Sequence, residues 1–84
     1  MKDHERDQLR KTILELLLKG GFSWTVLKKR VLGSCQPFAT NGAFSRQMKY
    51  LEGEGYVKKL GEKGSRTQYE ITEKGKLLLS IFDR

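Results

Sequence analysis

The sequence of 84 residues has little of the chemistry that catalytic or metal sites require. Its single cysteine, Cys35, and single histidine, His4, provide neither an internal disulfide nor the ligand set of a structural zinc site. It contains no Gly-rich phosphate loop and no Ser-His-Asp or Cys-His pattern. The longest apolar run is three residues, whereas a membrane span needs about 20. We therefore expect a protein that is not an enzyme, has no cofactor or metal and is not in a membrane. Because no apolar leader follows Met1, we also expect it in the cytoplasm.

Negative charge is missing from the middle of the chain. The formal net charge is +7, and residues 21–50 carry five cations and no carboxylate. These cations are Lys28, Lys29, Arg30, Arg46 and Lys49. Because a solvated surface usually mixes charges of both signs, this stretch favours a polyanionic partner such as nucleic acid.

The spacing of apolar residues predicts four helices and one hairpin. A first helix ends at the glycine pair 20–21, and an extended pair, Phe22-Ser23, precedes the second helix. The third helix begins near Thr40 or Asn41 and runs to about Gly53, with Gly55 in the left-handed conformation after it. Two strands, 56–60 and 66–71, flank a turn rich in glycine, and Thr72 caps a last helix.

This order of elements predicts one domain over residues 1–84, mainly α with a small β-hairpin. A second and a third helix joined by a short loop are typical of a helix-turn-helix, and a hairpin directly after it is a wing. We therefore expect a winged helix-turn-helix with the order helix, strand, helix, helix, hairpin wing, helix. The helix-turn-helix would span about 23–54, the wing about 56–71 and the C-terminal helix about 72–82.

Two motifs resemble a known family. The segment 44–57, FSRQMKYLEGEGYV, resembles the recognition helix and first wing strand of winged helix-turn-helix regulators, in which a Ser-Arg pair, a Leu-Glu step and a Gly-aromatic-Val step recur. The segment 69–75, YEITEKG, resembles the end of the second wing strand and the start of the next helix. The nearest groups are the PadR-, MarR- and ArsR-like prokaryotic regulators, and the resemblance covers about residues 9–80. It implies a DNA-binding transcriptional regulator associated with the nucleoid. The cysteine metal motif of ArsR-type sensors is absent, so metal sensing is not implied.

The third helix presents the candidate contacts to double-stranded DNA. Opposite its apolar stripe lie Gly42, Ser45, Arg46 and Lys49. Arg46 can donate two hydrogen bonds to guanine, and Asn41 can bind adenine in a similar way. Ser45 and Lys49 are better suited to phosphates, and Gly42 allows the helix backbone to approach the DNA closely. The resemblance supports Ser45, Arg46 and Lys49 by their positions. Gln47 also suits adenine but lies nearer the buried flank.

Further cations lie outside the third helix. In the wing we expect contacts to the DNA backbone or minor groove from Lys58, Lys63, Ser65 and Arg66, and on the second helix a phosphate contact from Lys28. Other interpretations of these charged residues stay open. Arg46 and Lys49 can form ion pairs with Glu52 or be solvated, and basic residues on a hairpin edge also prevent aggregation. The alternatives for the whole protein are a non-specific architectural DNA-binding protein and a winged helix used only for protein contact.

Apolar residues beyond the needs of one small core predict a homodimer. We expect Leu14 and Leu18 on the far side of the first helix, and Leu78, Ile81 and Phe82 partly uncovered on the last. A patch of this size is larger than monomers normally expose. A two-fold axis there would set two recognition helices about one DNA turn apart. The alternative is a monomer whose last helix packs wholly on its own domain.

Overall fold

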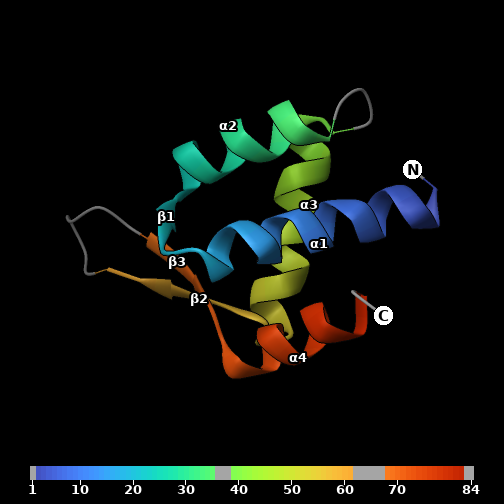
Figure 1. Cartoon of the computed structure of the whole chain (residues 1–84). Coiled ribbons are helices and arrows are strands. Elements are labelled where there is room, and N and C mark those ends of the chain that lie inside the picture. The colour runs from blue at the N-terminus through green and yellow to red at the C-terminus, as the bar shows by residue number, and fades with distance from the viewer. Residues whose placement is uncertain (1, 36–38, 62–67, 83–84) are drawn as a thin grey trace.

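The computed structural model describes residues 2–35, 39–61 and 68–82, which form helices around a small antiparallel sheet (Figure 1). The elements are α1 (Asp3–Leu18), β1 (Phe22–Ser23), α2 (Trp24–Ser34), α3 (Asn41–Gly53), β2 (Val57–Leu60), β3 (Gln68–Ile71) and α4 (Glu73–Phe82). This order confirms the predicted fold class, a winged helix-turn-helix in which α2 and α3 form the helix-turn-helix and β2 and β3 the wing.

Short polar side chains begin three of the helices, as the sequence predicts. Ser23 Oγ accepts a hydrogen bond from the Val26 N–H at 3.4 Å at the start of α2. Thr40 Oγ1 accepts from the Ala43 N–H at 3.1 Å at the start of α3, and Thr72 caps α4 in the same way. Each of these oxygens satisfies a backbone donor that the first turn of a helix leaves without an intrahelical partner.

The extended pair between α1 and α2 is the third strand of the wing sheet. The strand order is β1-β3-β2, with Phe22 opposite Tyr69 and Ser23 opposite Gln68. The start of α2 is therefore hydrogen-bonded to the wing. Three of the candidate DNA contacts, Lys63, Ser65 and Arg66, lie outside the described residues.

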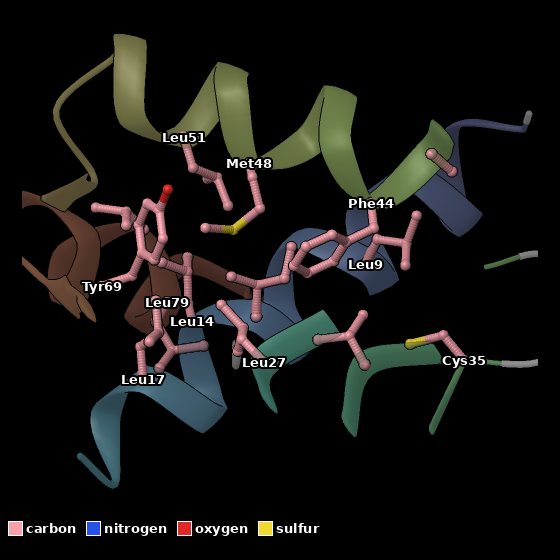
Figure 2. Close-up of a cluster of buried hydrophobic side chains, with 14 residues drawn as sticks. Leu9, Leu14, Leu17, Leu27, Cys35, Phe44, Met48, Leu51, Tyr69 and Leu79 are labelled. Atoms are coloured by element: carbon pink, nitrogen blue, oxygen red, sulfur yellow. The ribbon is translucent and has the colours of Figure 1, made fainter. Parts of the chain in front are cut away.

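The core lies where α1, α2, α3 and the inner face of the sheet meet (Figure 2). Phe44 of α3 is completely buried, and the ring of Trp24 packs edge-to-face against it at 4.9 Å between centroids. Tyr69 contributes from the wing, and its burial raises the pKa of its phenol above the ordinary value, with a smaller contribution from the negative charge of Glu52. The Tyr69 ring also packs against Trp24, at 5.8 Å between centroids, so Trp24 of α2 links the wing to α3.

One sequence expectation about α1 is wrong. Leu14 was expected to face away from the core, yet none of its side chain is exposed. The reason is that α1 packs against α4 as well as against α2 and α3, so its buried surface is wider than one stripe. Leu14 and Leu17 lie beside Leu79 of α4 in Figure 2, and Leu79 is itself 4% exposed. Leu14 is therefore a core residue and is not available to a partner.

The first turn of α4 lies so close to Tyr56, just before β2, and to Ile71 at the end of β3 that only glycine fits at position 75. A Cβ there would overlap the carbonyl oxygen of Tyr56 and lie 2.7 Å from Ile71 Cγ1. We predict that Gly75→Ala lowers the free energy of unfolding by roughly 1–3 kcal/mol, as overpacking does. Chemical denaturation measures this change.

Gly33→Ala is the matched control, because a Cβ at this position in α2 meets nothing within 4 Å. Alanine should raise stability there by up to about 1 kcal/mol, since glycine is the poorer helix former. Equal effects of the two substitutions would contradict the close packing of α4 on Tyr56 and Ile71.

Candidate nucleic-acid interface

The two faces of α3 differ sharply in chemistry. Phe44, Met48 and Leu51 are buried, while Gly42 and Arg46 on the opposite face are exposed. Exposed residues continue along that face with Lys49 and Gly53, at helical spacing. Asn41 is exposed at the first position of the helix and Ser45 is half-buried at the edge of the face. The structure thus brings Asn41, Gly42, Ser45, Arg46 and Lys49 together on one surface, as predicted.

The cations of this face have no acidic partner among the described residues. The ion pairs of that part of the chain join Arg6 to Asp3 and Asp7 on α1, and Lys76 to Glu73 on α4. No ion pair there links Glu52 to Arg46 or Lys49. A Cβ on Gly42 would lie 3.9 Å from Arg46 Nη1, so the Arg46 side chain extends along the helix over the glycine. Its guanidinium therefore lies next to a position that has no side chain.

The wing cations differ in their surroundings. Lys58 stands opposite Glu70 on β3, whereas Lys59 stands opposite Tyr69, and both lysines are exposed. Because side chains alternate along a strand, Lys58 points to the sheet face away from the core and Lys59 to the face shared with Val57. Lys59 is therefore the wing lysine that has no acid directly opposite it.

On α2, the three consecutive cations are not equivalent. Lys28 is half-buried, and Lys29 and Arg30 are exposed. The Arg30 guanidinium lies 5.2 Å from the centroid of the Phe22 ring. The structure therefore leaves Lys28 only partly accessible to a partner.

A polar contact beside the exposed face joins α1 to α3, and no pattern in the sequence indicates it. Arg10 Nε donates a hydrogen bond to Gln47 Oε1 at 2.7 Å, and the guanidinium carbon lies 3.8 Å from the centroid of the Tyr50 ring. Gln47 is 7% exposed, which confirms its expected place on the buried flank. Arg10 and Gln47 are 37 positions apart, so no local pattern connects them.

The arrangement defines a class of protein, a winged helix-turn-helix whose third helix presents a cationic surface. Solved structures share this fold. A transcriptional regulator from Clostridium thermocellum superposes with a TM-score of 0.78 at 25% identity, covering 98% of this chain and 82% of the regulator. PadR from Bacillus subtilis, solved in complex with operator DNA, gives a TM-score of 0.70 at 24% identity over 88% of this chain. This chain spans 45% of the length of that PadR chain.

The fold is therefore that of PadR-like winged helix regulators. No protein-family model matches the sequence. A search of curated proteins likewise found no match. Within the described residues, none of the helices has the length and apolar character to cross a membrane.

Proposed function

We propose that this protein is a DNA-binding transcriptional regulator that places α3 in the major groove of double-stranded DNA. The observation that carries the proposal is the exposed face of α3, where Arg46 and Lys49 have no ion pair among the described residues. The opposite face of α3 is buried in the core. An α-helix fits the major groove, and its exposed side chains reach base edges there. The fold shared with PadR, which was solved on operator DNA, supports this placement.

The residues of α3 take different parts in this proposal. Arg46 presents a planar fork of donors that matches guanine, and it discriminates between bases. Asn41 reads adenine at the start of the helix, and Ser45 and Lys49 hold phosphates. Gly42 keeps the surface flat, which lets the backbone come close to the DNA.

The wing would contact the DNA backbone or minor groove beside this helix. Of the wing cations, Lys58 and Lys59 lie within the described residues. We include Lys59 among the proposed contacts because no acid stands opposite it on β3. Lys63, Ser65 and Arg66 remain candidates from the sequence. On α2, Lys28 would reach a phosphate with the accessible part of its side chain.

We further propose that the protein is a homodimer through α1 and α4. The three most exposed large apolar side chains of the described residues are Leu77 at 69%, Ile81 at 60% and Leu18 at 53%. Leu77 and Ile81 are four positions apart on α4 and so lie on one side of that helix. Leu18 of α1 lines a surface pocket together with Lys76 of α4. We propose that these three belong to one surface, which we call the α1–α4 apolar surface. Leu78 and Phe82, also predicted for this interface, are half-buried against the core and would contribute its edge.

Contact between two copies through this surface would place it on the two-fold axis. The two copies of α3 would then read half-sites about one DNA turn apart, as in other dimeric helix-turn-helix proteins. A palindromic target sequence follows from this symmetry.

Selection of bound sites from random duplex DNA, followed by substitution, tests the assignment of α3. We predict that Arg46→Ala weakens binding to the selected site by about 1–3 kcal/mol and relaxes the preference at one base pair of each half-site. Lys58→Ala should weaken binding to selected and unrelated duplexes to the same extent, because a phosphate contact carries no sequence information. Competition binding with both duplexes measures the difference.

Two results would contradict this proposal. If Arg46→Ala keeps the full base preference, α3 does not read the DNA as assigned. If selection yields no preferred site, the protein binds DNA as an architectural protein does, and failure to bind duplex DNA even in low salt would favour a winged helix used for protein contact.

The dimer is tested by sedimentation equilibrium at micromolar concentration. We predict that Leu77→Glu and Ile81→Glu convert a dimer into a monomer, because each places a charge at the centre of the apolar surface. Val26→Glu is the control, since Val26 is 41% exposed but lies on α2. A wild-type protein that sediments as a monomer, or a dimer that dissociates only on Val26→Glu, would show that the interface is wrong.

A further inference from the structure

A row of cations and tyrosines lies along the flank of α3. The Arg10 guanidinium carbon is 3.8 Å from the centroid of Tyr50, and the Tyr50 and Tyr56 centroids are 6.3 Å apart at 39°. At the other end, Lys74 Nζ lies 5.0 Å from the centroid of Tyr56. We call these four residues the Arg10–Lys74 row. Both cations are within the distance at which a ring face attracts positive charge.

Each cation of the row also donates a hydrogen bond to α3 or its cap. Arg10 Nε bonds to the Gln47 side chain in the middle of the helix. Lys74 Nζ bonds to the Glu54 carbonyl oxygen at 2.7 Å, at the C-terminal end, where the helix dipole favours a cation. The recognition helix is thus held on this flank from α1 at one point and from α4 at another.

These contacts are directional, whereas the core contacts of α3 are not. Apolar burial through Phe44, Met48 and Leu51 fixes which face of α3 points inward but tolerates small rotations about the helix axis. A hydrogen bond to a buried amide fixes both distance and angle. Gln47 is the residue after Arg46, and Tyr50 lies one helical turn beyond Arg46. Arg10 therefore contacts α3 at two residues that lie within one turn of Arg46.

We propose that Arg10 is a positioning residue for DNA reading: it acts through Gln47 and Tyr50 to fix the direction of Arg46 and does not itself contact DNA. This inference rests on the proposed function of α3. Base recognition tolerates displacements of only about 0.5 Å, so a small rotation of α3 would cost discrimination between sequences before it cost the fold.

The test compares Arg10→Met with Arg6→Met. Methionine keeps an unbranched apolar side chain but removes the charge and the donors. Arg6 lies one turn earlier on α1 and pairs with Asp3 and Asp7 of its own helix, so it is the matched control. For each variant, affinity for the selected duplex and for an unrelated duplex is measured across a range of salt concentrations.

We expect Arg10→Met to lower the ratio of selected to unrelated affinity by about tenfold, the loss of one charged hydrogen bond. The slope of log affinity against log salt should stay that of the wild type, because no phosphate contact is lost. In the Arg46→Ala background, Arg10→Met should cause no further loss of discrimination, since both changes remove the same interaction. Arg6→Met should leave the ratio unchanged.

Three results would overturn the inference. A slope reduced by about 1, with equal loss on both duplexes, would make Arg10 a direct phosphate contact. If Arg10→Met leaves the ratio of selected to unrelated affinity unchanged, or if its loss of discrimination adds to that of Arg46→Ala, then Arg10 does not act through Arg46. If Arg10→Met does not fold, Arg10→Lys, which keeps the charge over Tyr50, serves in the same assay and should still lower the ratio. If the wild-type protein selects no preferred site from random duplex DNA, the proposed function itself is wrong, and this result is distinguished from the others because it is obtained without any variant.

Discussion

The packing of α1 against all three other helices is the constraint on which the rest of the structure depends. This helix contacts α2, α3, α4 and β3, and in Figure 1 it crosses the middle of the molecule between α2 and α4. Its residues Leu9, Ile13, Leu14 and Leu17 are all buried. A chain of 84 residues buries a modest share of its surface, so one central helix that covers several neighbours is an economical way to build a core. The side of α3 that is left outward is determined by that packing.

The consequence for function is a division of α3 into parts with separate tasks. Its inward face attaches to the core, its flank receives directional contacts from Arg10 and Lys74, and its outward face presents Arg46 and Lys49. The ion pairs of the described residues lie on α1 and α4, so the outward face keeps its charge for a partner. On the proposal that Arg10 fixes the direction of Arg46, a polyanion that binds there meets a preorganised cation, and preorganisation of this kind lowers the cost of binding.

The elements and the outward face of α3 could be predicted from the sequence because local signals define them. The caps Ser23, Thr40 and Thr72, the positive φ of Gly55 and the spacing of Phe44, Met48 and Leu51 all depend on nearby residues. Contacts between distant segments could not be predicted in this way.

The burial of Leu14 depends on where α4 packs. The hydrogen bond from Arg10 to Gln47 joins residues 37 positions apart, and no helical or strand spacing relates two such residues. Which apolar residues of α4 face solvent could not be predicted either, because Leu77, Leu78, Leu79, Ile81 and Phe82 go most of the way round the helix.

The central claim is that the outward face of α3 meets DNA, and amide chemical shifts of the isotope-labelled protein on addition of a short duplex test it most directly. The account predicts that the largest changes fall on Gly42, Arg46 and Lys49 and on the wing, while amides on the outward side of α4 hardly move. Changes centred on α4, or none at all with duplex DNA in low salt, would contradict it.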